Sequence, residues 1–255
     1  MRFLSIVLTT LISCATLYEK ASCENQRLIF AFSEFGPFKF MKDNHPNGLD
    51  VQLLREIARK LNMRMEFVEC SFARCMEFLK TGEADVVTSL QRRPDREEYI
   101  RFIEPPYLTK SAKRFYVRKG YGWRIKKHED LYGMRIGVKR GVAYFPRFDS
   151  DSKILKEAVN DAFLNLKKLE KGRIDAFINT ESEGDFLIKK GGFEGAFEKA
   201  PYTFNEKCDV YIGLSKKSKL MPQIREIETI TAKVVTADLI RDLERKAFEA
   251  VPTKK

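Results

Sequence analysis

Hydrophobic and polar residues follow one another in blocks that predict alternating strands and helices in the first third of the chain. Short apolar runs typical of buried strands occupy residues 27–32, 64–69 and 85–90. Two helical patterns lie between them, the first with Asp50 as its expected N-cap, the second capped by Ser71 and ended by Gly82. Pro94 suits the first turn of another helix. This order predicts a parallel sheet covered by helices.

The same order of elements restarts near residue 133. Strand patterns occur at 133–141, 153–159 and 173–179. A helical pattern over 160–172 ends at Gly172, and a shorter helix is expected over 185–193. A further strand at 208–217 precedes helical periodicity over 221–249. We therefore predict an α/β protein of two lobes, each a mostly parallel sheet flanked by helices, with the C-terminal part returning to the first lobe.

The N-terminal residues have the order of a secretory signal. A positive start, Met1-Arg2, precedes an uncharged apolar run, and Ala21 and Cys23 occupy the small-residue positions before a cleavage site. The uncharged run is short for a membrane span, which needs about 20 residues. We expect residues 1–23 to be a signal peptide and the mature protein to be soluble in the periplasm.

The chemical state expected of the cysteines depends on whether the protein is exported. Leu11-Ile12-Ser13-Cys14 resembles a bacterial lipobox, so lipid anchoring at Cys14 is an alternative, ranked below plain secretion. Outside the cytoplasm a disulfide is permitted, and a Cys70–Cys75 bridge would join a strand end to the next helix. Free thiols are the alternative. With two histidines and no CxxC pair, no metal site is expected.

The formal net charge is +11, and removal of residues 1–23, which carry a net charge of one, leaves +10. Such a charge can attract nucleic acid. The basic residues are scattered, however, and an exported protein does not meet the genome, so we expect no nucleic-acid partner. The chain lacks a GxSxG elbow, a P-loop and a GxGxxG loop, and neither histidine lies near a nucleophile motif. We therefore expect no enzyme of these classes and no cofactor.

Six segments occur in a characteristic order between residues 27 and 248. They are FGPFKF, NGLDVQLLREIARKL, FARCMEFLKTGEADVV, RRPDREEYIRFIEPPY, LYGMRIGVKRG and KLEKGRIDAFI. Each segment alone is weakly specific, but the ordered set is specific. Through it the chain resembles the bacterial extracellular solute-binding proteins of family 3, the polar amino acid uptake type.

The resemblance implies a type II periplasmic-binding fold, in which two lobes joined by two crossing strands close on a small ligand. Lobe 1 would comprise residues 27–108 plus 209–255, and lobe 2 residues 111–206. The hinges would lie near 108–111 and 205–210. The resemblance also implies a monomer that delivers its ligand to a membrane ABC permease.

The resemblance assigns three residues of lobe 1 to the ligand. Arg96 matches the arginine that binds the ligand α-carboxylate, a role for which a guanidinium can form two parallel bonds. An exposed helix-face arginine is the alternative, and Arg92 and Arg93 match no family role. Phe35 and Phe72 match the aromatic residues on either side of the ligand, although aromatic residues are more often core.

Two further matches in lobe 1 concern the ligand ammonium. Thr88 and Ser89 match positions that offer carbonyl and hydroxyl groups to it, with strand-end capping as the equal alternative. Gln91 stands where the family often has threonine or serine, and its amide could donate or accept.

Lobe 2 departs from the family pattern. The segment Gly141-Val142-Ala143-Tyr144 lacks the usual hydroxyl residue, which leaves backbone amides at Val142 and Ala143 as ligand contacts. The usual aspartate is also missing, and the neighbouring Glu181 could bind the ammonium in its place or be a solvated loop acid. Because of these departures, the sequence does not specifically predict an unmodified α-amino acid as the ligand. It still predicts a small ligand that bears a carboxylate.

The sequence therefore predicts a periplasmic protein that captures a small carboxylate-bearing ligand, an amino acid or a derivative of one, by hinge closure. It would deliver this ligand to an ABC importer. Two alternatives remain open. The first is an enzyme similar to the periplasmic cyclohexadienyl dehydratases, which share this fold and use a carboxylic acid in the cleft, here Glu181. The second is a ligand-sensing partner of a membrane receptor.

Overall fold

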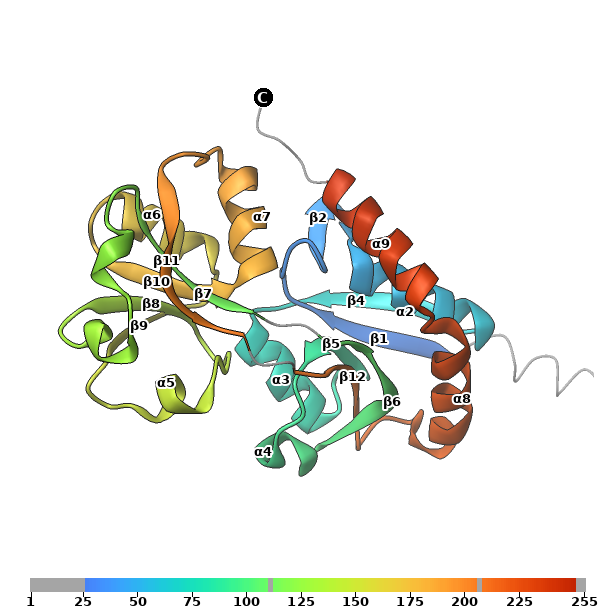
Figure 1. The fold of residues 1–255 in the computed structure, drawn as a ribbon. Helices are drawn as coiled ribbons and strands as arrows, with labels where there is room; N and C mark the ends of the chain where they lie inside the picture. Colours follow the sequence, from blue (N-terminus) through green and yellow to red (C-terminus); the bar gives the residue numbers. More distant parts are fainter. Residues whose placement is uncertain (1–25, 110–111, 206–207, 251–255) are drawn as a thin grey trace, which may run out of the picture.

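The computed structural model describes residues 26–109, 112–205 and 208–250, and it contains two five-stranded sheets. The sheets form two lobes that lie side by side in Figure 1, each with its own helices. The expected signal peptide, residues 1–23, and Cys14 lie outside the described residues. Within the described ranges, none of the helices combines the length and hydrophobicity needed to cross a bilayer.

The first lobe contains the sheet with strand order β4-β1-β5-β12-β6. Its strands are β1 (Arg27–Phe32), β4 (Arg64–Glu69), β5 (Val86–Leu90), β6 (Ile100–Leu108) and β12 (Val210–Ser215). β1 runs parallel to β4 and β5, whereas β12 is antiparallel to β5 and β6. A small hairpin of β2 (Phe40–Lys42) and β3 (His45–Asn47) lies beside it. The three strands predicted in this part of the chain are confirmed.

Helices cover this sheet by burying one face each. They are α2 (Leu49–Lys60), α3 (Phe72–Thr81), α4 (Pro94–Glu97), the 3-10 turn η3 (Met221–Gln223), α8 (Ile224–Val234) and α9 (Ala237–Glu249). The helical spacing in α2 correctly predicted its buried positions, which include Leu53, Leu54, Ile57 and Ala58. Ser71 caps α3 by accepting the Arg74 N–H, and Gly82 ends it in the left-handed conformation, both as predicted.

The second lobe repeats this arrangement with strand order β11-β7-β10-β8-β9. Its strands are β7 (Lys113–Arg118), β8 (Arg135–Lys139), β9 (Leu155–Val159), β10 (Ala176–Thr180) and β11 (Phe197–Phe204). Its helices are η1 (Gly122–Arg124), η2 (His128–Leu131), α5 (Pro146–Ser150), α6 (Phe163–Glu170) and α7 (Glu181–Gly191). β8 is parallel to β9 and β10, and β7 is antiparallel to β10 and β11.

Each sheet thus has three neighbouring parallel strands, a fourth strand antiparallel to them and a fifth antiparallel to the fourth. This arrangement confirms the expected α/β fold of mostly parallel sheets. The C-terminal part returns to the first lobe as predicted, because β12 pairs within the first sheet and α8 and α9 pack on α2. The chain leaves the first lobe between β6 and β7 and comes back between β11 and β12. The hinge positions near 108–111 and 205–210 remain predictions.

Five strands, β2, β3, β6, β7 and β11, were not predicted from periodicity. Proline explains two of these omissions, because it cannot donate a ladder hydrogen bond and marks a segment as loop. Pro105 and Pro106 lie where the β6–β12 register is interrupted, between Ile103 and Leu108. Pro201 lies in the corresponding interruption of β11 against β7.

Asp50 does not cap α2, so that prediction was wrong. The N-cap is Gly48, whose φ of 112° is a conformation that glycine adopts most readily. A Cβ atom at position 48 would lie only 2.2 Å from the Phe38 carbonyl oxygen, so glycine is required there. With Gly48 as the N-cap, the helix begins two residues earlier than it would with Asp50 as the cap. Asp50 instead lies within the first turn and is completely buried.

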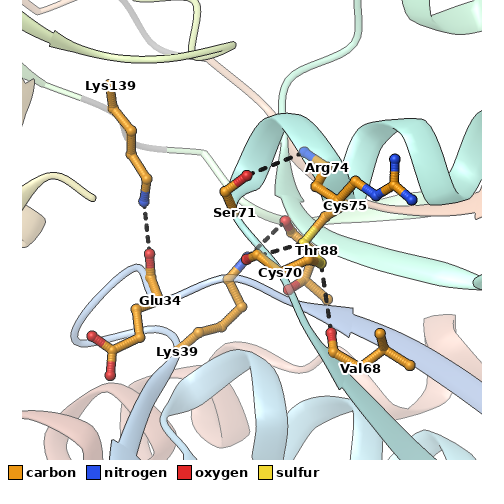
Figure 2. The surroundings of a disulfide bond; sticks show 9 residues. All are labelled: Glu34, Lys39, Val68, Cys70, Ser71, Arg74, Cys75, Thr88 and Lys139. Carbon is orange, nitrogen blue, oxygen red and sulfur yellow. Dashed lines mark hydrogen bonds between the residues drawn. A yellow bond between two sulfur atoms is a disulfide. The ribbon is translucent and has the colours of Figure 1, made fainter. Parts of the chain in front are cut away.

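The Cys70–Cys75 disulfide is present and joins the end of β4 to α3 (Figure 2). We expect a Cys70→Ala/Cys75→Ala variant to lose about 2 kcal/mol of unfolding free energy, the loop-entropy value for so short a loop. Urea denaturation of both proteins would measure this loss. A Cys208→Ala variant is the matched control, because Cys208 is a free thiol. Equal urea midpoints for the double variant and the parent protein would contradict the prediction.

Candidate ligand-binding site

A cavity lies between the two lobes, with about 710 Å³ of space that no atom fills, open solvent at its edge included. The first lobe lines it with Ser33, Phe35, Phe38, Lys39, Phe72, Ser89, Gln91, Arg96, Leu108 and Val210. The second lobe lines it with Lys113, Lys139, Val142, Ala143 and Thr180. Several of these residues end or follow the parallel strands β1, β5, β8 and β10. Open α/β sheets bind ligands at this edge.

Aromatic rings form the apolar part of the cavity wall. Phe35 stacks on Phe38, with ring centroids 5.3 Å apart. A tight turn holds this loop, because Phe35 and Lys39 exchange two backbone hydrogen bonds of 2.7 and 2.9 Å. Phe72 begins α3 and is 9% exposed. The structure therefore brings the two predicted aromatic residues to one cavity, where flat apolar faces can contact a small solute.

Arg96 is buried at the cavity, with 7% of its surface exposed. It lies in α4, its Nη1 donates to the Gln91 carbonyl oxygen at 3.3 Å, and its guanidinium lies 5.7 Å from the centre of the Phe72 ring. No salt bridge to Arg96 occurs among the described residues. Burial, with a smaller contribution from Arg93, lowers its pKa. A buried guanidinium without a carboxylate partner is suited to an incoming carboxylate.

The other two arginines of this segment form surface ion pairs. Arg92 pairs with Glu104, and Arg93 pairs with Asp95 at 2.9 Å. Neither lines the cavity between the lobes. Exposed pairs of this kind contribute little to stability, and their position agrees with the absence of a family role.

Lys39 lines the cavity and belongs to a buried network that extends behind its wall. Its Nζ donates to the Thr88 carbonyl oxygen at 3.1 Å and lies 3.9 Å from the Asp50 carboxylate. Asp50 also accepts hydrogen bonds from the Ser89 hydroxyl at 2.6 Å and the Tyr107 hydroxyl at 2.9 Å. Burial lowers the pKa of Lys39 to about 8, although Asp50 opposes this shift. Burial likewise raises the pKa of Asp50 against the effect of Lys39.

Two more lysines reach the cavity from the second lobe. Lys113 donates to the Thr180 hydroxyl at 2.8 Å, and burial lowers its pKa to about 8. Lys139 donates to the Glu34 backbone carbonyl at 2.7 Å and lies 3.5 Å from the buried Glu183 carboxylate. Burial raises the pKa of Glu183 despite this neighbouring lysine. Both lysines are less than one-tenth exposed.

The lobes touch each other beside the cavity. Figure 2 shows Lys139 of the second lobe reaching to Glu34 of the first. The Glu34 carboxylate also pairs with Lys190 of α7 at 3.1 Å. The ring of Phe186, on the same helix, fits so closely over Gly36 that a Cβ atom there would lie 2.2 Å from it. The structure is therefore that of a molecule whose lobes are packed together around the cavity.

Most of the residues predicted from the sequence come together at the cavity, namely Phe35, Phe72, Ser89, Gln91, Arg96, Val142 and Ala143. Thr88 and Glu181 do not line it. The Thr88 carbonyl accepts the hydrogen bond from Lys39, and Glu181 lies in a separate groove, paired with Lys199 at 2.8 Å and Arg114 at 3.1 Å. The ligand contacts of all nine residues remain predictions.

The three cavity lysines were missed from the sequence. Lysine is rarely buried, so its residue type predicted exposed positions. One signal was available: Lys139 ends a strand just before the Gly141 turn, at the sheet edge where ligands bind. Lys39 and Lys113 carry no comparable local signal.

The cavity lining is suited to capturing an anion by hydrogen bonds and charge. Neither histidine lines it: His128 is buried against Asp151 and Tyr202, and His45 is exposed in β3. Among the described residues, no group of three His, Cys, Asp or Glu side chains is placed to hold a metal ion. The structure thus offers binding groups from both lobes.

Known proteins share this architecture and part of the sequence. A Vibrio harveyi protein whose name describes an amino-acid ABC transporter-binding protein, PatH, is 24% identical over 223 residues, which cover 80% of this chain and 86% of the relative. The amino acid ABC transporter substrate-binding protein AbpA of Streptococcus pneumoniae, solved with L-arginine, superimposes with a TM-score of 0.76 at 20% identity, covering 89% of this chain and 97% of that one.

A second solved structure, a Salmonella typhimurium periplasmic binding protein described as highly specific for arginine, has a TM-score of 0.74 at 19% identity. The match covers 87% of this chain and 98% of the Salmonella chain. These likenesses establish the type II periplasmic-binding fold. Residues 28–180, more than half of the chain, match the bacterial extracellular solute-binding proteins, family 3. The chain therefore belongs to the bacterial extracellular solute-binding proteins of family 3.

Proposed function

We propose that the protein binds a small carboxylate-bearing solute, an amino acid or a derivative of one, between its lobes and delivers it to a membrane ABC importer. The observation that supports this most strongly is Arg96, a buried guanidinium at an aromatic-walled cavity with no salt bridge among the described residues. A carboxylate would supply the missing partner through two charge-assisted hydrogen bonds.

Ligand capture proceeds by hinge closure. Arg96 lies on the first lobe, and Lys113 and Lys139 lie on the second, so a ligand that contacts all three binds the closed state more tightly than the open one. That difference in affinity is what shifts the population toward closure. Contacts between the lobes, such as the Glu34–Lys190 pair, further stabilise the closed state.

The protein acts outside the cytoplasm as a monomer, exported through the signal peptide at residues 1–23. The named relatives are transporter-binding proteins, which favours a permease partner over a receptor partner. They also favour binding over catalysis. Glu181, the acid considered for a dehydratase, lies outside the cavity and pairs with Lys199.

A thermal-shift screen over amino acids, small dicarboxylates and aromatic acids tests the proposed function. A ligand at 100 times its Kd should stabilise the folded state by about 2.7 kcal/mol, which raises the Tm of a chain of this size by about 5–10 °C. Prephenate belongs in the screen, with its concentration followed over time. Prephenate turnover, or the absence of any stabilising solute, would contradict a pure binding function.

A further inference from the structure

The carbonyl oxygen that was predicted to accept from a ligand ammonium already accepts from an ammonium of the protein. The Thr88 carbonyl oxygen accepts a hydrogen bond from Lys39, whose Nζ also lies 3.9 Å from Asp50. The Ser89 hydroxyl donates to the same carboxylate and is therefore already part of the network of Lys39 and Asp50. A protonated amine on the ligand would meet the ammonium of Lys39 here and would be repelled by it.

The charges around the cavity also disfavour a ligand that carries an ammonium group. Four cationic side chains line it, Lys39, Arg96, Lys113 and Lys139, and no carboxylate is among the lining residues that the structure describes. Two buried carboxylates lie directly behind, Asp50 beside Lys39 and Glu183 beside Lys139. The cationic side chains that line the cavity therefore outnumber the carboxylates beside them.

These cations lie beside both aromatic walls. The guanidinium of Arg96 is 5.7 Å from the centre of the Phe72 ring. The ammonium groups of Lys39 and Lys139, one from each lobe, are 5.8 and 6.0 Å from the centre of the Phe35 ring. A ligand held between the rings can therefore meet a cation next to either ring.

We propose that the ligand is a small dianion, a dicarboxylate without a protonated amine, with one acid group bound by Arg96 and the other by the cavity lysines. The inference rests on the proposed function and narrows its ligand class. Burial lowers the pKa of Lys39 and Lys113 to about 8, and a bound anion would favour the charged form of both lysines. A basic amino acid would bring further positive charge into a cavity that already holds an excess of it.

Isothermal titration calorimetry at pH 7 with a panel of single compounds tests the ligand class. The dicarboxylates are succinate, glutarate, adipate and phthalate, and butyrate and benzoate are the monocarboxylate controls. L-Glutamate adds an ammonium to a dicarboxylate, and L-arginine adds net positive charge. We expect at least one dicarboxylate to bind at least ~tenfold more tightly than its monocarboxylate control. The same dicarboxylate should also bind at least ~tenfold more tightly than L-glutamate and L-arginine.

The panel separates failure of this inference from failure of the proposed function. If an amino acid binds more tightly than every dicarboxylate, the dianion inference is wrong and the binding function stands. If no compound in the panel or in the wider thermal-shift screen binds, both are contradicted.

A lysine variant tests the second acid group. We expect Lys113→Met to weaken dicarboxylate binding at least ~tenfold while changing monocarboxylate binding less than ~threefold, because only the second carboxylate loses its partner. Lys113 has no salt bridge among the described residues, so the variant leaves no buried carboxylate without its salt-bridge partner. Lys233→Met, on the exposed face of α8, is the matched control. Equal losses for both ligand classes, or no loss for the dicarboxylate, would overturn the inference.

Discussion

Replacing Arg96 with alanine is expected to weaken ligand binding about 100-fold, a loss of about 2.7 kcal/mol. The guanidinium is buried and keeps no salt bridge among the described residues, so a bound carboxylate would be its principal charged partner. Charge-assisted hydrogen bonds contribute about 1.5–3 kcal/mol each, and a bidentate pair forms two. Calorimetric titration of the tightest ligand from the solute screen gives the change in Kd.

Arg93→Ala is the matched control for this variant. Arg93 is three residues away, on the exposed side, and its partner is Asp95. Its removal should leave Kd within about threefold, as for other exposed ion pairs. The Arg96→Ala variant should also remain folded, because no carboxylate loses its partner with it. An unchanged Kd in a folded Arg96→Ala protein would rule out the carboxylate contact.

Replacing Asp50 with alanine is expected to lower the unfolding free energy by about 3–5 kcal/mol, the usual loss when one member of a buried ion pair is removed. Asp50 is completely buried and is the acceptor for the Ser89 and Tyr107 hydroxyls. Its loss leaves both hydroxyls and the ammonium of Lys39 without this carboxylate. Buried donors without partners cost about 1–3 kcal/mol each. Denaturation by urea, followed by circular dichroism, measures the change.

Two further variants separate these contributions. Asp50→Asn keeps an acceptor oxygen but removes the charge, so it should be less destabilising than Asp50→Ala. Glu56→Ala removes a surface carboxylate from the same helix, paired with Arg59 at 2.8 Å, and should cost less than about 1 kcal/mol. If Asp50→Ala were no more destabilising than Glu56→Ala, the Asp50 network would not be a stabilising element of the first lobe.

Local patterns predicted much of the fold. Strands β1, β4 and β5 were found because their apolar runs are short and bounded by turn residues. Helix α3 was found because Ser71 and Gly82 have cap chemistry that acts within a few residues. Arg96, Phe35 and Phe72 were predicted to contact the ligand from the order of family segments around them. The structure places all three at one cavity.

Other features could not be read locally because a neighbour distant in sequence produces them. Asp50 has the residue type of a cap, but Phe38 packs so close to Gly48 that the helix starts earlier and the carboxylate turns inward. Glu181 was expected at the ligand, yet Lys199 and Arg114 of neighbouring strands pair with it outside the cavity. Both cases depend on which charges and backbone groups the folded chain brings near.

By itself, the sequence determined the α/β architecture and the family, because periodicity, caps and ordered motifs are properties of neighbouring residues. Only the tertiary structure decided the charge of the cavity. A lysine can be buried as a cation only where acceptors from other segments reach its ammonium, and Lys39 meets a carbonyl oxygen 49 residues away. Lys139 likewise meets a carbonyl of the opposite lobe, 105 residues distant. Such partners exist only after folding, so the proposed ligand class is argued from the structure and not from the chain alone.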